Sequence, residues 1–202
     1  VNPPSHVGGD DTQTLGYFAR MCPEKGLDKL VEAFISLKKR DEFKNLKLKI
    51  GGGCGPADEP FVEEMQGRLQ AKGLLGDVEF SPNLTRDEKI NFLKSLDVFS
   101  VPALYGEAFG LYVIEALAAG VPVVQPRHAA FPELIEATGG GWIWEPNVNS
   151  LADKIAEAIS DLDQLRFFGE TGRKIVHEKF GIEKMARETA ALFSEVAQNQ
   201  IK

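Results

Sequence analysis

The chain has 202 residues, of which 43% are hydrophobic, and carries a formal net charge of -7 at pH 7. This length allows one large or two small domains, and the repeated order of apolar strand and amphipathic helix favours one compact α/β unit. The acidic balance and the lack of a basic stripe argue against nucleic acid as a partner, so a phosphate ligand would have to be held by local positive groups.

The sequence contains neither a secretory signal nor an apolar run of the roughly 18 to 20 residues that a membrane-spanning helix needs. We therefore expect a soluble, cytoplasmic chain, with peripheral attachment at the inner membrane face left open. Two cysteines, Cys22 and Cys54, do not make a disulfide framework, and no Cys/His cluster has the spacing of metal ligands. Both cysteines are expected to follow adjacent strands, so whether their thiols lie close together stays open.

The amino-terminal half begins with a polar segment and then alternates strands with helices. Residues 1–13 are rich in Pro, Gly and Asp and predict a linker. A strand is predicted over Thr14–Arg20, and a helix over Lys25–Arg40, where apolar residues recur at helical spacing. A second strand over Leu46–Ile50 leads to a helix over Asp58–Lys72.

A glycine-rich turn, residues 51–56, follows the second predicted strand. It departs from the dinucleotide fingerprint G-x-G-x-x-G, because Pro56 occupies the place of the third glycine. This departure argues against a Rossmann dehydrogenase. A strand over residues 78–81 comes next, and Thr85 with Glu88 forms a predicted capping box at the start of a helix.

The stretch Ser100–Val124 is predicted as strand, loop, helix, turn and strand. Its first apolar run ends at Leu104, and a helix is predicted from Phe109 until Gly120 stops it. Such a helix starts just beyond the carboxyl end of a strand. Open α/β sheets bind ligands there, because unpaired N–H groups and the positive end of the helix dipole face the crevice. Gly110 has no Cβ, so its backbone can approach a phosphate closely.

Two carboxylates, Glu107 and Glu115, bracket the start of this helix. Glu115 sits among aliphatic residues, so its charge needs either a partner or a solvated position. A helix residue that simply points at solvent is the alternative interpretation.

The remaining sequence predicts a short helix ending at the glycines 139–141, a strand over Trp142–Trp144, and a helix capped by Asn149 or Ser150. Two further helices are predicted over residues 163–179 and 182–197. The predicted fold class is therefore α/β: a Rossmann-like, doubly wound parallel sheet of about six strands flanked by helices, with extra carboxyl-terminal helices.

Residues 107–124, E-A-F-G-L-Y-V-I-E-A-L-A-A-G-V-P-V-V, resemble the donor-binding motif of retaining glycosyltransferases with the GT-B fold, in glycosyl transferase group 1 (family 4). In that family the first glutamate contacts hydroxyls of the donor sugar, the second holds the ribose, and the amides after the F-G pair meet the diphosphate. The resemblance implies these roles for Glu107, for Glu115, and for Phe109, Gly110 and Leu111.

A second string, A-R-M-C-P-E-K-G, is similar to the family's G-R-x-x-x-x-K-G, whose Arg and Lys bind the phosphates and stabilise the leaving group. The resemblance thus assigns catalytic roles to Arg20 and Lys25 alongside Glu107. Alone, two cations at a strand end can converge on a diphosphate, but solvated surface residues are the plainer interpretation. Ala19 stands where the family has glycine.

Three further donor contacts are implied by the resemblance. Gly53 lies in a turn comparable to the family's glycine turn beside the nucleotide, and Asn83 and Leu84 lie in the loop that faces the nucleobase. Tight-turn residues without a ligand are the alternative for all three.

The chain departs from the family pattern at other positions. Ala103 replaces a common serine, and the pair Ala129-Ala130 replaces a usual glycine pair before the matching Glu133. Arg127 and His128 are candidate neighbours of the site, although a lone loop histidine is usually just exposed.

The resemblance implies a donor-binding domain over residues 14–202, with residues 1–13 joining it to an absent amino-terminal, acceptor-binding domain. The donor would be a UDP-, GDP- or ADP-hexose, with no cofactor and no metal, and the isolated domain would be inactive. In the family the final helix crosses back to the other domain. We therefore expect part of an apolar stripe to be exposed and to favour self-association; the stripe comprises Met185, Thr189, Leu192, Phe193 and Val196.

Two alternatives remain open from the sequence. One is another GT-B enzyme, such as an epimerase or a phosphorylase, although no sequence context for a pyridoxal phosphate lysine is visible. The other is a non-enzymatic, flavodoxin-like interaction module, in which the acidic residues form only a solvated rim. The module predicts that Glu107→Gln and Glu115→Gln leave every binding event unchanged. The base, sugar, acceptor, linkage and oligomeric state stay open.

Overall fold

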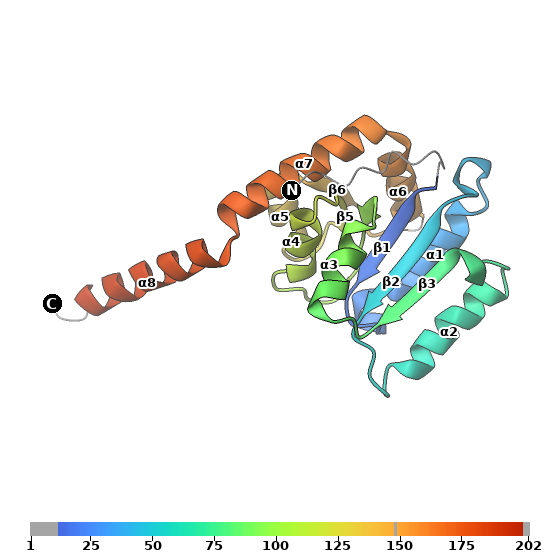
Figure 1. Ribbon diagram of the computed structural model, residues 1–202, viewed down its shortest axis with the longest axis horizontal. Helices are drawn as coiled ribbons and strands as arrows, with labels where there is room; N and C mark the ends of the chain where they lie inside the picture. The colour runs from blue at the N-terminus through green and yellow to red at the C-terminus, as the bar shows by residue number, and fades with distance from the viewer. Residues whose placement is uncertain (1–11, 148, 200–202) are drawn as a thin grey trace.

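The computed structural model describes residues 12–147 and 149–199 and contains one parallel sheet with helices on both faces (Figure 1). The spatial order of the strands is β3-β2-β1-β4-β5-β6, and every neighbouring pair is parallel. This is the order of a doubly wound Rossmann fold, which confirms the predicted fold class. The strands are β1 (Thr14–Phe18), β2 (Lys47–Gly52), β3 (Val78–Pro82), β4 (Val98–Phe99), β5 (Val123–Pro126) and β6 (Gly141–Trp144).

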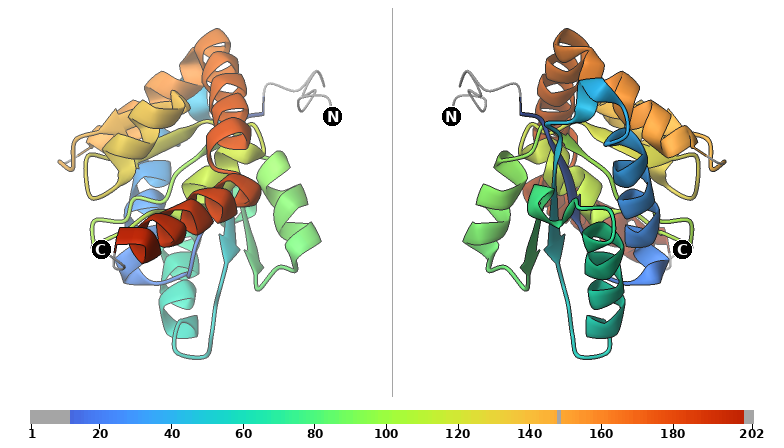
Figure 2. Two further views of the ribbon diagram at one scale, coloured as in Figure 1. Left: turned by 90° about the vertical axis from the view of Figure 1, so that its left-hand side faces the viewer. Right: turned by 90° about the vertical axis from the view of Figure 1, so that its right-hand side faces the viewer.

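The helices divide between the two faces of the sheet. Helices α1, α2 and α6 cover one face, and α3, α4, α5 and α7 cover the other (Figures 1 and 2). This division follows from right-handed crossovers that run in opposite directions from β1. The helices are α1 (Leu27–Leu37), α2 (Glu59–Gln70), α3 (Arg86–Lys94), α4 (Leu111–Ala118), α5 (Phe131–Thr138), α6 (Ser150–Ser160), α7 (Leu162–Lys179) and α8 (Ile182–Asn199).

The core lies between the sheet and these helix layers. The central strands are apolar because both of their faces are covered, and Leu15, Tyr17, Leu48 and Ile50 are fully buried. Helix α1 buries the apolar stripe that its sequence predicts, and α6 buries its own on the same face of the sheet. Burial of this surface, at about 25 cal/mol per Å², is the main stabilising term for such a fold.

The strand predicted over Ser100–Leu104 is wrong. Strand β4 ends at Phe99, and Ser100 is the last residue that bonds to the sheet, through its N–H to the Gly16 carbonyl at 2.9 Å. Beyond it Pro102 has no N–H, and Ala103 donates to the Val101 carbonyl at 2.8 Å in a local turn. The apolar run therefore continues as a buried irregular segment rather than a strand.

The predicted helix starts are partly confirmed. The capping box of Thr85 and Glu88 is present, with both reciprocal hydrogen bonds. Helix α4 begins at Leu111, not at Phe109. The predicted cap of α6 is wrong, because Asn149 has φ 67° and makes no side-chain cap, while the Ser150 hydroxyl is bonded to backbone carbonyls of the preceding loop.

The predicted linker lies almost wholly outside the described residues. Its end at Gln13 is attached to the domain, since its side-chain amide donates to the Ile159 carbonyl at 2.6 Å and its own carbonyl accepts the Lys47 N–H at 2.9 Å.

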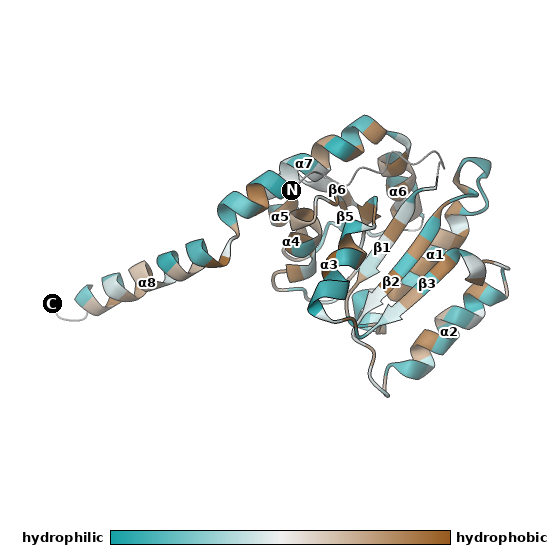
Figure 3. Ribbon diagram, in the orientation of Figure 1, coloured by the Kyte–Doolittle hydropathy of each residue, from teal (hydrophilic) through white to brown (hydrophobic). Residues whose placement is uncertain are grey.

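Helix α8 extends away from the rest of the domain (Figure 1), and hydrophobic residues recur along it (Figure 3). The predicted exposure of its apolar stripe is confirmed, because Met185, Leu192, Phe193 and Val196 are 48–69% exposed. Across the part of the chain that the structure describes, no helix combines the length and apolar character needed to cross a membrane.

Candidate functional site

The strand order reverses between β1 and β4, and the loops that leave these strands meet beyond their carboxyl ends. Gly26 makes this meeting possible. It has φ 72°, and a Cβ there would lie 2.3 Å from the carbonyl oxygen of Pro102. Glycine tolerates both the left-handed backbone and the close approach. The K-G pair of the sequence thereby brings Lys25 against the segment that follows β4.

Arg20 follows β1 and is held by Asp58, at the start of α2. The Nε of Arg20 lies 3.0 and 3.1 Å from the two carboxylate oxygens, and the Asp58 carboxylate also accepts the Gly55 N–H at 3.0 Å. The side chain of Asp58 is only 8% exposed, whereas that of Arg20 is 62% exposed. The hydrogen bonds from Arg20 and Gly55 lower the pKa of Asp58. The carboxylate therefore stays ionised and fixes the guanidinium at this end of the sheet.

Lys25 and Glu107 form an ion pair across the two loops. The Lys25 Nζ lies 2.5 Å from Glu107 Oε2, the Tyr112 hydroxyl donates to the same oxygen at 2.9 Å, and the Gly110 N–H donates to Oε1 at 3.2 Å. Although burial acts to raise the pKa of Glu107, the hydrogen bonds from Lys25 and Tyr112 outweigh it and lower that pKa. Glu107 is therefore an ionised carboxylate with three protein donors.

Helix α4 begins directly beside this carboxylate. Gly110 precedes it with φ 78°, a conformation that glycine adopts without strain. The first-turn N–H groups of any helix lack partners within it and carry the positive end of its dipole. Phe109 and Leu111 flank this turn and are 44% and 66% exposed. A helix therefore starts next to Lys25 and Glu107, two residues later than predicted.

Glu115 lies on α4 and is paired with Lys89 of α3. The Lys89 Nζ is 2.6 Å from Glu115 Oε1 and 5.8 Å from the centroid of the Phe18 ring, at the end of β1. The Glu115 side chain is 40% exposed. Glu115 thus has both a partner and a solvated position, as its place in an apolar stretch requires.

The other three predicted donor contacts lie around the ends of β2 and β3. Asn83 has φ 55°, and its side-chain amide is bonded to the backbone of Cys54 at 3.0 and 2.8 Å. Leu84 is partly buried against the core. A Cβ on Gly53 would meet nothing within 4 Å. Asn83 therefore joins the two loops through its side chain.

Both cysteines are free thiols, with Cys22 buried and Cys54 half-buried. Their loops are adjacent, because the Met21 N–H donates to the Gly53 carbonyl at 2.8 Å. Burial raises the pKa of each thiol, so neither has the character of an activated nucleophile.

The departures from the family pattern have simple structural settings. Ala103 is fully buried. Ala129 has φ 50°, a left-handed conformation that glycine would adopt at lower cost. Arg127 is exposed and pairs with Glu145 after β6, so its charge is already matched.

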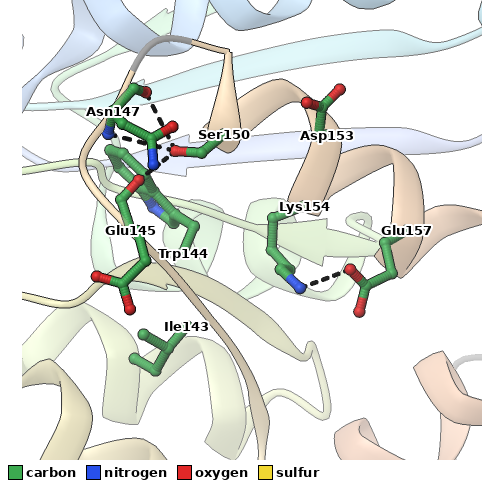
Figure 4. Close-up of a pocket in the computed structure, with 8 residues that line it drawn as sticks. All are labelled: Ile143, Trp144, Glu145, Asn147, Ser150, Asp153, Lys154 and Glu157. Carbon is green, nitrogen blue, oxygen red and sulfur yellow. Dashed lines mark hydrogen bonds and ion pairs between the residues drawn. The ribbon is translucent and has the colours of Figure 1, made fainter.

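A pocket of about 350 Å³ lies elsewhere, between the end of β6 and the first turns of α6 (Figure 4). None of the predicted site residues lines it. Its ionisable groups include Lys154 and Glu157, which pair with each other at 2.5 Å. Within residues 12–147 and 149–199, no group of three or more His, Cys, Asp or Glu is arranged to hold a metal ion.

Three polar residues of the site are not among the sequence-based candidates: Asp58, Tyr112 and Lys89. The side chain of each contacts a predicted site residue that lies on another element or far away in the sequence. A polar signal existed for Tyr112, whose hydroxyl needs a partner although its neighbours Leu111 and Val113 are aliphatic. Asp58 and Lys89 read as ordinary helix-surface residues.

Comparison with known proteins shows which family this chain resembles. The sequence model of the family described as "Glycosyl transferases group 1" matches residues 3–175. An uncharacterized glycosyltransferase of Methanocaldococcus jannaschii is 29% identical over 91% of this chain and 45% of its own length. A GDP-mannose-dependent alpha-(1-6)-phosphatidylinositol monomannoside mannosyltransferase of Mycobacterium tuberculosis is 28% identical over 88% of this chain and 46% of its own length.

Among solved structures, sucrose-phosphate synthase from Thermosynechococcus elongatus superposes with a TM-score of 0.81 at 25% identity, over 93% of this chain and 46% of that one. The Rossmann-like fold is therefore shared with one part of a larger enzyme. The chain spans about half the length of the curated relatives it matches. Because the family match extends over most of the sequence, the chain belongs to the glycosyl transferases of group 1.

Proposed function

We propose that residues 14–202 form the donor-binding half of a retaining hexosyltransferase, which binds a nucleoside diphosphate sugar at the switch point between β1 and β4. The observation that supports this most is the position of Lys25 beside Glu107 at the amino terminus of α4, with a second cation, Arg20, after the neighbouring strand β1. A diphosphate carries the charge that this combination favours. A relative named as GDP-mannose-dependent supports the same donor class.

In this proposal the carboxylates divide the rest of the donor between them. Glu107 accepts hydrogen bonds from hydroxyls of the sugar, since it is ionised and adjoins the cation that meets the diphosphate. Glu115 accepts from the ribose hydroxyls, with Lys89 as its protein partner. Gly53, Asn83 and Leu84 would lie toward the base.

The proposed reaction breaks the bond between the anomeric carbon and a phosphate oxygen, and the electron pair leaves with the nucleoside diphosphate. A bond forms between the anomeric carbon and the acceptor oxygen on the same face, and the acceptor proton passes to the departing phosphate. Arg20, Lys25 and the α4 dipole stabilise the charge that develops on the leaving group. The proposal therefore requires no metal ion, no cofactor and no general base from this chain.

The acceptor lies outside this proposal, because the residues that would choose it belong to a further amino-terminal domain. We expect the chain by itself to bind the donor without transferring its sugar to an acceptor.

Isothermal titration of the folded 202-residue chain tests the donor site. The ligands are UDP, GDP and ADP, each also as a glucose or mannose conjugate, in buffer with a metal chelator. We expect one base to be preferred, and the double variant Arg20→Ala/Lys25→Ala to lose that binding while remaining folded. If no nucleotide binds to the wild type, or if the double variant binds equally well, this assignment is wrong.

A further inference from the structure

Tyr112 contacts both charged groups of the Lys25–Glu107 ion pair. Its hydroxyl donates to Glu107 Oε2 at 2.9 Å, and the Lys25 Nζ lies 5.7 Å from the centroid of its ring. Two aromatic rings hold it from other elements, Phe99 of β4 and Phe131 of α5, each with its centroid 6.3 Å away. A cation over the face of an aromatic ring and a hydroxyl on a carboxylate are both stabilising. Tyr112 therefore fixes the two charges relative to α4.

The two oxygens of Glu107 do not have equivalent partners. Oε1 accepts the Gly110 N–H at 3.2 Å, whereas Oε2 is shared by Lys25 and Tyr112. A carboxylate offers about four lone-pair sites, so at least one remains for a ligand hydroxyl. If a diphosphate draws Lys25 toward itself, Tyr112 remains as a side-chain donor to Oε2.

We propose that Tyr112 is a positioning residue for donor recognition: its hydroxyl keeps the Glu107 carboxylate oriented toward the sugar when Lys25 turns to the diphosphate. This inference rests on the proposed function and deepens it, because it separates recognition of the sugar from recognition of the nucleoside diphosphate. The sugar would depend on the Tyr112 hydroxyl, whereas the diphosphate would depend on Arg20, on the start of α4, and on the Lys25 ammonium with the ring beneath it.

The protonation states suit this division. Burial, followed by the neighbouring Glu107 charge, raises the pKa of Tyr112, so its hydroxyl remains a hydrogen-bond donor around neutral pH. Glu107 remains an acceptor, because the hydrogen bonds from Lys25 and Tyr112 prevail over burial and lower its pKa. The direction of the hydrogen bond is thus fixed.

Tyr112→Phe tests the inference cleanly, because it removes the hydroxyl and leaves the ring that packs on Phe99, Phe131 and Lys25. Tyr105→Phe is the matched control, since Tyr105 lies in the neighbouring loop and is 75% exposed. Calorimetric affinities of both variants and the wild type are measured for two pairs of probes, UDP with UDP-glucose and GDP with GDP-mannose. Glu107→Gln and the double variant Tyr112→Phe/Glu107→Gln complete a cycle.

The expected result is a change in the ratio between the affinity for the sugar conjugate and the affinity for the bare diphosphate. Tyr112→Phe should leave the affinity for the bare diphosphate within about twofold of wild type and weaken binding of the matching sugar conjugate by about fivefold, the effect of one hydrogen bond. The double variant should lose no more than Glu107→Gln alone, because both changes act on one contact. Tyr105→Phe should change neither affinity.

Two results would overturn the inference while leaving the proposed function intact: an equal loss of affinity for the diphosphate and its sugar conjugate, or an unchanged affinity for both. Equal loss would mean that Tyr112 only supports the local structure. If the wild type binds neither these four probes nor ADP and its sugar conjugates, the proposed function itself fails and the inference fails with it.

Discussion

The ammonium of Lys25 lies 2.5 Å from the carboxylate of Glu107, although 82 positions separate them in the sequence. Gly26 and Pro102 bring their loops together, and Tyr112 touches both charges. Arg20 is matched in the same way by Asp58. Each cation of the site is therefore oriented by its own carboxylate, and Lys25 would have to turn from Glu107 to meet a diphosphate.

Lys25→Ala should weaken binding of the preferred nucleoside diphosphate by about 10- to 100-fold, because a hydrogen bond to a charged group contributes about 1.5–3 kcal/mol. The loss should shrink as salt is added, because screening weakens the wild-type contact. Titration calorimetry at several ionic strengths measures both effects. Lys39→Ala, which removes the same charge from an exposed residue just beyond the end of α1, should change neither the affinity nor its salt dependence. Equal affinity for the wild type and the Lys25 variant would contradict the assigned role.

Asp58→Asn should lower the free energy of unfolding near neutral pH. The pKa of Asp58 is lowered in the folded state, chiefly by its hydrogen bond with Arg20, so ionisation of Asp58 favours folding at pH values above its unfolded pKa of about 3.9. That contribution is lost as the pH falls through the folded pKa.

Urea unfolding at pH values from about 6 down to about 3 checks this prediction. The gap between wild type and Asp58→Asn should narrow on acidification. Asp41→Asn serves as the control, because Asp41 is 88% exposed and its pair with Lys44 should contribute little. If the difference in unfolding free energy between wild type and Asp58→Asn stays constant across this pH range, the charge of Asp58 does not stabilise the fold.

Gly26→Ala should destabilise the domain more than Gly73→Ala. The two glycines have nearly the same backbone conformation, with φ 72° and 70°, but an added Cβ meets the Pro102 carbonyl at 2.3 Å in the first and nothing within 4 Å in the second. Both variants incur the left-handed cost of about 1–2 kcal/mol. Only Gly26→Ala adds a steric clash of about 1–3 kcal/mol. Chemical unfolding of the pair measures the difference, and equal losses would mean that the two loops can separate freely.

The exposed face of α8 should make the chain self-associate as its concentration rises, because contiguous exposed apolar side chains favour association. Sedimentation velocity over a range of concentrations detects this. Leu192→Gln with Phe193→Gln should restore a monomer, whereas Arg187→Gln with Glu188→Gln, on the same helix, should not. A wild-type chain that stays monomeric throughout would refute the prediction.

Much of the fold could be predicted from local patterns in the sequence. Leu15 and Tyr17 in β1, and the stripe of α1, reveal burial by their spacing alone. The strand expected over Ser100–Leu104 failed because apolar character indicates burial and not pairing; Pro102 and the turn at Ala103 end the hydrogen bonding after Ser100. Periodicity cannot distinguish a buried strand from a buried irregular segment.

The site was predictable to the extent that its residues belong to short motifs. Lys25 and Glu107 could each be nominated from their own strings, but their 2.5 Å contact depends on Gly26 fitting against Pro102, which no local pattern encodes. Asp58 and Lys89 could not be predicted as site residues for the same reason, since only the tertiary structure places them beside Arg20 and Glu115.

The most direct test of the donor site is a crystal structure of the chain with the nucleoside diphosphate that binds it most tightly. We predict that the diphosphate lies within hydrogen-bonding distance of the Arg20 and Lys25 side chains and of the first N–H groups of α4, with the ribose hydroxyls on Glu115. A diphosphate bound elsewhere, such as in the pocket between β6 and α6, would contradict the assignment.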